Sequence, residues 1–250
     1  TGGNGWIGSA ITSVLADLNA NVIVVSRDSN HHQFSTESDE VCYKSEHAHG
    51  IINIDADLTR TESIDMLFNN EDVVRLQPSI LVNNMCSWPT DFNFCMQSGD
   101  SMQSQLTQNV IPHALMIQRF VAELSKTSQS GSIINIASMY AHVAPDHGMY
   151  RGQGGQAIMY GAAKAALVQM TRYLAALLGP NGVRVNSVSP GPFPKPGTFN
   201  NKEWFERELK DRTMLRRVAE PHELKGVIAL LASDAGSYIT GADISVDGGW

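Results

Sequence analysis

Short apolar segments alternate with helix-periodic segments along the whole chain, and this alternation constrains the fold more than any other feature. The segments predicted as strands are 21–26, 51–54, 79–83, 132–137, 183–188 and 242–246. Continuous apolar runs of this kind are typical of strands buried on both faces, as in a parallel sheet covered by helices. The sequence therefore predicts an α/β fold with a doubly wound, Rossmann-like parallel sheet.

The segments between these strands carry apolar residues at helical spacing. Helices are predicted at 9–19, 61–76, 101–125, 157–178 and 220–233, with Pro112 interrupting the third. The apolar stripe predicted for the fourth helix comprises Ala163, Ala166, Leu167, Met170, Leu174 and Leu177. Segment 28–50 is polar and aperiodic, which predicts a loop or a weak helix. No linker or repeat divides the chain, so we expect one dinucleotide-binding catalytic domain over 1–250.

Composition excludes several classes of partner. The net charge of −7 argues against nucleic acid, because phosphate binding needs a basic surface. No apolar run approaches the roughly 18 residues of a membrane span, so no membrane partner is expected. Three cysteines without a CxxC pair favour a reduced, cytoplasmic compartment. His31, His32, His47 and His49 have no nearby ligand cluster, so we expect no metal site.

A glycine-rich turn opens the chain and precedes the first predicted helix. Its candidate cofactor-binding residues are Gly2, Asn4, Gly5, Trp6, Ile7 and Gly8. Glycines let the backbone approach a pyrophosphate, and a helix N-terminus offers N–H groups to it. Such a turn normally follows a buried strand, so we expect a first strand upstream of Thr1 that this chain lacks. The alternative interpretation is an ordinary turn between a strand and a helix.

The end of the second β-α unit bears on the choice of cofactor. In dinucleotide folds an acidic residue at this point bonds the ribose 2′-hydroxyl of NAD. Here Ser26 stands at the end of the strand and Arg27 follows, which suits a 2′-phosphate and favours NADP over NAD. Asp28 opposes this preference because it could neutralise Arg27, and Arg27 as a simple solvated charge is the alternative.

Tyr160 and Lys164 are four residues apart on a predicted helix and therefore share a face. An ammonium beside a phenol favours the phenolate, which brings the tyrosine pKa towards neutral pH and suits general acid–base catalysis. Ser138 ends a predicted strand, at the edge where open α/β sheets bind ligands. These three residues are the candidate catalytic core.

Taken together and in order, several motifs resemble the short-chain dehydrogenase/reductase family, in its compact single-domain branch. They are the glycine turn, Asp57-Leu58, Asn83-Asn84, Asn109, Ser138, Tyr160-Gly-Ala-Ala-Lys164, Asn186-Ser-Val-Ser-Pro190-Gly191 and Val246-Asp247-Gly248-Gly249. The resemblance runs from Thr1 to Gly249. It implies an oxidoreductase that transfers a hydride between NADP(H) or NAD(H) and a ketone or secondary alcohol.

The resemblance also implies residue roles. Tyr160 would transfer the substrate proton, Lys164 would bond the nicotinamide ribose and lower the Tyr160 pKa, and Ser138 would hold the carbonyl oxygen. Asn109 would support a water relay to Lys164. The remaining roles concern the cofactor: Asp57 with Leu58 at the adenine, Asn83 along the cofactor, and Pro190 with Gly191 at the nicotinamide. A homodimer or homotetramer through the helices of Asn109 and Tyr160 is expected.

Two departures from the family pattern leave alternatives open. Gly2, Gly5 and Gly8 follow the spacing of sugar-nucleotide epimerases and dehydratases, with Trp6 in place of the compact branch's middle glycine, so such an enzyme is one alternative. A catalytically silent NAD(P)-binding regulator is another. Segment 145–156 lengthens the stretch between Ser138 and Tyr160. We hypothesise that its His147, Arg151 or Gln153 contacts a polar substrate such as a sugar, sugar acid or polyol.

Overall fold

The computed structural model describes residues 1–27, 50–87, 93–151 and 157–250, and the strands in these ranges pair in parallel. One ladder joins β1 (Val22–Ser26) to β2 (Ile51–Asp55), and the other has the order β3-β4-β5-β6. The strands of the second ladder are β3 (Ile80–Asn83), β4 (Gly131–Ile136), β5 (Val183–Pro190) and β6 (Asp243–Val246). The predicted Rossmann-like parallel architecture is confirmed. The predicted loop 28–50, with its four histidines, lies outside the described residues except for Gly50.

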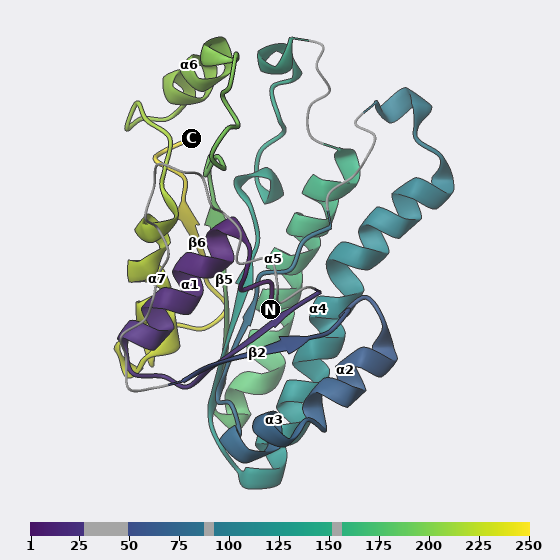
Figure 1. The fold of residues 1–250 in the computed structure, drawn as a ribbon, viewed down its shortest axis with the longest axis vertical. Helices are drawn as coiled ribbons and strands as arrows, with labels where there is room; N and C mark the ends of the chain where they lie inside the picture. Colours follow the sequence, from purple (N-terminus) through teal and green to yellow (C-terminus); the bar gives the residue numbers. More distant parts are fainter. Residues whose placement is uncertain (28–49, 88–92, 152–156) are drawn as a thin grey trace.

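Helices lie on both sides of the strands (Figure 1). The first face carries α1 (Trp6–Asp17) and α7 (Lys225–Ala232); the second carries α2 (Thr61–Phe68), α4 (Gly99–Thr127) and α5 (Ile158–Leu178). Neighbouring residues of β4 point into separate cores: Ile133 packs with the second face and Ile134 with the first. Because both cores are apolar, the strands are buried on both sides, as their composition predicts. The remaining helices are α3 (Glu71–Leu76) and α6 (Glu203–Arg212).

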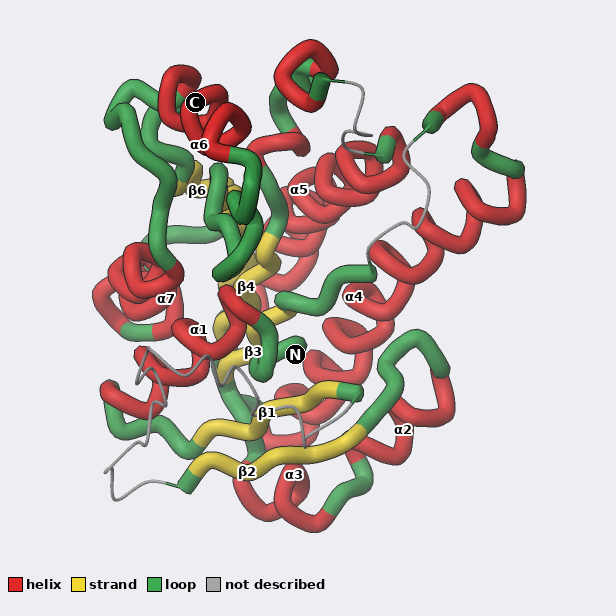
Figure 2. Tube along the Cα trace, turned by 45° about the horizontal axis from the view of Figure 1, so that its top comes forward, coloured by secondary structure: helices red, strands yellow, loops and turns green. Residues whose placement is uncertain are grey.

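The first two residues lie between the two ladders, as the N-terminal label in Figure 2 shows. The amino group of Thr1 donates to the Val82 carbonyl of β3 at 2.7 Å, and the Gly2 amide donates to the Val25 carbonyl of β1 at 2.8 Å. The Thr1 hydroxyl accepts from the Asn84 amide at 3.0 Å. The glycine turn is thereby fixed at the carboxyl ends of β1 and β3.

Two helix predictions are wrong in detail. The helix predicted over 61–76 is two helices, because the Asn70 side chain accepts a hydrogen bond from the Asp72 amide and begins α3. Pro112 does not interrupt its helix: α4 runs through it from Gly99 to Thr127, with Pro112 buried. Proline removes one intrahelical donor, and packing along the rest of a long helix outweighs that loss.

Two further differences concern the second half of the chain. The helix predicted over 220–233 begins as a 3₁₀ turn, Pro221–Leu224, before α7. On α5, Leu177 is 56% exposed, and the buried stripe is Ala163, Lys164, Leu167, Val168, Thr171, Ala175 and Leu178. The stripe is rotated because α5 buries polar Lys164 and Thr171, which an apolar pattern does not reveal. No described helix is long and apolar enough to cross a membrane.

Candidate active site

A cleft of about 1020 Å³ lies at the carboxyl ends of the parallel strands. Its walls come from the glycine turn, the ends of β1, β3, β4 and β5, the start of α5, and α6 with the segment before it. Open α/β sheets bind their ligands at this edge. Most of the predicted site residues line the cleft: Gly2, Gly5, Trp6, Ile7, Ser26, Arg27, Asp57, Leu58, Ser138, Tyr160, Lys164, Pro190 and Gly191.

The glycine turn packs too tightly for side chains at two positions. Gly2 has a φ of +63°, and a Cβ there would lie 3.0 Å from the Asn84 carbonyl oxygen. A Cβ on Gly8 would lie 2.0 Å from the Gly2 carbonyl oxygen, inside any permitted contact. The start of α1 is therefore pressed against the turn. Its first residues, Trp6 and Ile7, line the cleft, and no side chain caps the helix. This arrangement suits a pyrophosphate.

Polar groups gather at the β1–β2 end of the cleft. The Asn4 amide donates to the Ser26 hydroxyl at 2.9 Å, so Asn4 supports the site from outside its lining. Arg27 is exposed at the rim. Hydrogen bonding from the Thr59 hydroxyl, at 2.7 Å, and the nearby charges of Arg27 and Arg60 lower the pKa of Asp57. The structure thus holds Asp57 ionised in the electrostatic reach of Arg27, while Asp28 lies outside the described residues.

Ser138, Tyr160 and Lys164 meet in the middle of the cleft. Ser138 follows β4, and its hydroxyl is hydrogen-bonded to the Tyr160 phenol. The Lys164 ammonium lies 5.8 Å from the centre of the Tyr160 ring and donates to the Ile136 carbonyl at 2.8 Å. The predicted catalytic core is therefore assembled from β4 and α5.

The electrostatics of this core differ from the prediction. Burial raises the pKa of Tyr160, the neighbouring Cys86 thiol raises it further, and the Ser138 hydrogen bond lowers it. Burial also lowers the pKa of Lys164. The predicted lowering of the Tyr160 pKa by Lys164 does not dominate, because both side chains are desolvated and the ammonium is bonded to a backbone carbonyl. In this structure the phenol holds its proton at neutral pH.

Besides Asn4, three predicted site residues are not part of the cleft lining: Asn83, Asn109 and Gly8. The Asn109 amide is committed to the segment after β3: its Oδ1 accepts from the Ser87 amide at 2.8 Å and its Nδ2 donates to the Ser87 carbonyl at 3.0 Å. Asn83 is fully buried and donates to the Asn135 side chain at 3.1 Å. Both residues therefore support the wall, and the predicted contacts of Asn83 with cofactor and of Asn109 with a relay stay predictions.

Gly191, at the nicotinamide end of the predicted site, has no room for a side chain. A Cβ there would lie 2.6 Å from the Asp247 Cα. The close approach of the segment after β5 to Asp247, after β6, therefore requires glycine at position 191.

The structure also brings aromatic residues to the cleft. Tyr140 and Tyr150 line the cleft, and their hydroxyl oxygens are 2.9 Å apart. Phe205 of α6 also lines it and lies 5.4 Å from the Tyr150 ring, centre to centre. Two of the three have a sequence signal: Tyr140 stands two residues after Ser138, and Trp204, Phe205 and Leu209 have the apolar spacing of a short helix over a substrate. Tyr150 comes from a segment whose folding over the cleft is a tertiary event.

The described part of this segment, residues 145–151, lies beside the cleft, but the two described residues hypothesised to meet a polar substrate contact other groups. The Arg151 guanidinium lies 4.5 Å from the centre of the Trp204 ring and 3.7 Å from a Glu208 carboxylate oxygen, on α6. Neither Arg151 nor His147 lines the cleft. Gln153 lies outside the described residues.

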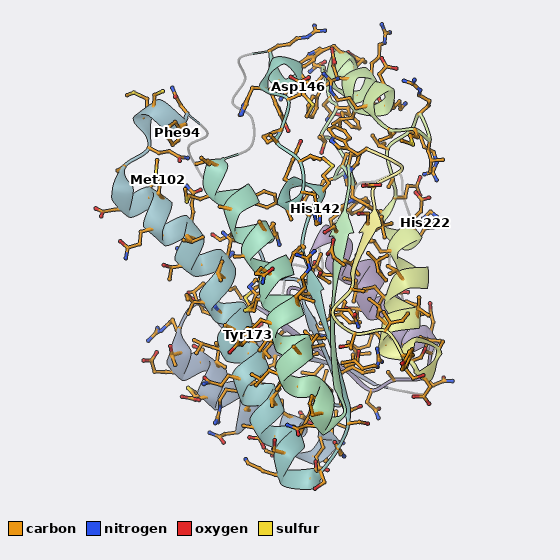
Figure 3. The ribbon with its side chains drawn as sticks, turned by 180° about the vertical axis from the view of Figure 1, so that it is seen from behind. Phe94, Met102, His142, Asp146, Tyr173 and His222 are labelled. Atoms are coloured by element: carbon orange, nitrogen blue, oxygen red, sulfur yellow. The ribbon has the colours of Figure 1, made fainter. Side chains whose placement is uncertain are left out.

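The turn that carries Ser138 is anchored from behind by His142, which Figure 3 shows between the strands and the end of the molecule that bears Asp146 and α6. Its Nε2 lies 2.7 Å from an Asp243 carboxylate oxygen and 3.3 Å from the Ser189 hydroxyl. The same nitrogen meets both partners, so this is an anchor and lacks the relay geometry of a hydrolase triad. Across the described residues, no group of three or more metal-ligating side chains gathers.

Comparisons with known proteins agree with this geometry. The family model described as enoyl-(acyl carrier protein) reductase matches residues 4–250. A 3-oxoacyl-[acyl-carrier-protein] reductase of Aquifex aeolicus is 31% identical over 252 residues, covering 100% of this chain and 94% of the relative. A cyclohexanol dehydrogenase of Rhodococcus is 40% identical over 131 residues, so the match covers 52% of this chain and only 46% of that relative.

Solved structures show the same architecture. A short-chain dehydrogenase from Leptospira borgpetersenii with bound NAD⁺ superposes with a TM-score of 0.82 at 27% identity. That match covers 99% of this chain and 89% of the Leptospira chain.

Proposed function

Because the chain belongs to the short-chain dehydrogenase/reductase family, we propose that its cleft holds NADP(H) or NAD(H) and interconverts a ketone and a secondary alcohol at Tyr160. The family membership makes the protein an NAD(P)-dependent oxidoreductase acting on CH–OH groups. The observation that carries the proposal is the meeting of Ser138, Tyr160 and Lys164 in the cleft that the glycine turn opens.

The residues present fit a dinucleotide. The uncapped start of α1 and the tight turn at Gly2 and Gly8 would take the pyrophosphate. The groups around Ser26 and Asp57 would take the adenosine, and Lys164 with the Pro190-Gly191 turn would border the nicotinamide end. The bound cofactor supplies the hydride; the protein orients the reactants and handles the proton.

In the direction of reduction, Tyr160 donates its phenolic proton to the carbonyl oxygen, and Ser138 donates a hydrogen bond to the same oxygen. The phenol of Tyr160 carries its proton at neutral pH, as the donor in this direction must. The positive charge of Lys164 then stabilises the phenolate that remains. In the direction of oxidation the same phenolate accepts the alcohol proton.

We favour NADP over NAD as the cofactor. Ser26 stands where NAD-specific folds place a carboxylate, its hydroxyl bonds Asn4, and Arg27 is exposed at the rim. Asp57 opposes this choice because it lies within the electrostatic reach of Arg27. The Leptospira relative was solved with NAD⁺, which makes NADH the necessary comparison.

The assembly we propose is a homodimer or homotetramer through α4 and α5. Large apolar side chains on these helices are exposed in the single chain: Leu106, Ile111, Tyr173 and Leu177. Such side chains on two adjacent helices favour burial against a second copy.

The test compares the wild type with Tyr160→Phe. Nicotinamide fluorescence during titration with NADPH and NADH should show tighter NADPH binding, equal in the two proteins. Ketone reduction should fall roughly 10²–10⁴-fold in Tyr160→Phe, the usual contribution of general acid–base catalysis. Tighter NADH binding would reverse the cofactor choice only.

Three other outcomes would contradict the proposed function. If the folded protein binds neither cofactor, the proposal is overturned. Full activity of Tyr160→Phe would remove Tyr160 as the acid. Cofactor binding without net oxidation or reduction of any substrate would favour a catalytically silent regulator. If a sugar nucleotide is converted under these conditions, an epimerase or dehydratase is favoured.

A further inference from the structure

The cleft has two chemically different ends. The glycine turn, β1 and β2 form one end, where the described charged lining residues are Arg27 and Asp57. The other end lies beyond Tyr160, under α6 and segment 145–151, which Figure 1 shows together at one end of the molecule. A dinucleotide that follows the glycine turn occupies the first end, which leaves the second for the substrate.

This second end is lined mainly by apolar and aromatic side chains. Its members are Met139, Tyr140, Tyr150, Phe193, Phe205 and Leu209. Met139, Tyr140 and Leu209 are almost completely buried. Two described lining residues on this side of the cleft are charged. They are Lys164, beside Tyr160, and Lys195, which is exposed.

The two phenol hydroxyls of this wall bond each other, and charged side chains outside the lining pair with one another. The Tyr140 and Tyr150 hydroxyls are hydrogen-bonded at 2.9 Å. Arg212 of α6 pairs with Asp146 and, at 2.5 Å, with Glu208. The Arg212–Asp146 pair and the contact of Arg151 with Trp204 hold segment 145–151 against α6, and the side chains of Tyr150 and Phe205 line the cleft.

From this lining we infer that the substrate is an apolar ring ketone, alicyclic or aromatic, or the corresponding secondary alcohol. This inference rests on the proposed function. A ring buried against Tyr150, Phe205 and Leu209 removes apolar surface from water without burying further polar groups of the substrate. A polyhydroxylated ketone such as a sugar would bury hydroxyls here with few described partners, and each unpaired hydroxyl weakens binding.

The experiment measures kcat/KM with NADPH, or NADH if it binds tighter, for four ketones. They are cyclohexanone, the two-ring 2-decalone, fructose and an acetoacetyl thioester. We expect 2-decalone to exceed fructose by at least tenfold, since a single methylene in an apolar pocket is worth roughly tenfold or more. Phe205→Ala should reduce this ratio about tenfold through KM. The control is Tyr238→Ala, which removes a fully exposed ring outside the cleft and should leave the ratio unchanged.

Calorimetric titration of the cofactor-bound wild type with 2-decalone and fructose separates this inference from the proposed function. Preferred turnover of fructose or of the thioester would overturn the inference and leave the function standing. Binding of 2-decalone without turnover of any ketone would support an apolar second end of the cleft and overturn the proposed oxidoreductase function. If the wild type neither binds nor turns over 2-decalone, the inference is overturned. It is also overturned if Phe205→Ala has the same ratio of kcat/KM for 2-decalone to kcat/KM for fructose as the wild type.

Discussion

At the scale of single residues, His113 is the most unusual group outside the proposed chemistry. It lies on α4, is fully buried, and neither ring nitrogen has a hydrogen bond of standard geometry to a described residue. Burial lowers its pKa to about 3, the charge of Lys164 contributes in the same direction, and a contact with the Met85 backbone opposes them. His113 is therefore neutral in the folded protein throughout the physiological range.

This pKa shift predicts an acid-sensitive fold. Below the unfolded-state pKa of about 6.5 the unfolded chain binds a proton at His113 that the folded protein rejects, so stability falls as pH falls from about 6.5 towards 3. Between pH 7 and pH 5 this histidine should remove about 2 kcal/mol from the free energy of unfolding.

Urea denaturation at the two pH values, in the wild type and in His113→Leu, measures that share. Leucine fills a similar volume without a titrating group, so the variant should lose about 2 kcal/mol less on acidification. Equal losses in both proteins would contradict the assignment.

At the scale of secondary-structure elements, α4 determines where the chain runs after β3. The Asn109 amide binds the Ser87 backbone through two hydrogen bonds and the Gln105 carbonyl through a third. Ser87 and Cys86 line the cleft, so a buried helix side chain sets the position of a cofactor-side wall.

Asn109→Ala should loosen this wall. We expect a loss of about 1–3 kcal/mol in the free energy of unfolding, because buried backbone groups of Ser87 lose their partners. The KM for the cofactor should rise with it. Ser87→Ala is the matched control, since it keeps the backbone groups that Asn109 binds. A cofactor KM in Asn109→Ala equal to that of Ser87→Ala would show that this bond pattern does not position the wall.

At the scale of the whole molecule, the cleft spans both ladders, which meet at Thr1 and Gly2. We propose that residues 1–250 form one dinucleotide-binding domain. The two larger apolar cores lie on opposite sides of β4, which contributes Ile133 to one and Ile134 to the other. They therefore cannot unfold independently without breaking that strand.

Cofactor binding should therefore stabilise the molecule as one unit. At a concentration a hundred times the Kd, a ligand of the folded state adds about 2.7 kcal/mol. For a protein of this size that raises the midpoint of unfolding by roughly 5–10 °C. Differential scanning calorimetry should show one transition that moves as a whole. Two transitions, of which NADPH shifts one, would divide the chain into two domains.

The sequence by itself predicts the strands, the parallel sheet and the residues that meet at the cleft centre. Strands buried on both faces leave a continuous apolar run, and Tyr160 and Lys164 share one helix, so their juxtaposition follows from spacing alone. Ser138 could be placed because the carboxyl ends of parallel strands meet at one edge. Each of these features depends on residues that are close together in the sequence, so it can be predicted before the tertiary contacts are known.

Tertiary structure alone decided the rest. The predicted lowering of the Tyr160 pKa is outweighed by desolvation, which depends on what packs around the phenol. Leu177 is exposed and Lys164 buried on the same helix, because neighbouring elements choose which face of α5 is covered. Tyr150 and Phe205 are 55 residues apart in sequence, and only the packing of α6 against segment 145–151 brings their rings to the substrate end. Such contacts leave no periodicity in the chain, since each partner reads separately as an ordinary aromatic residue.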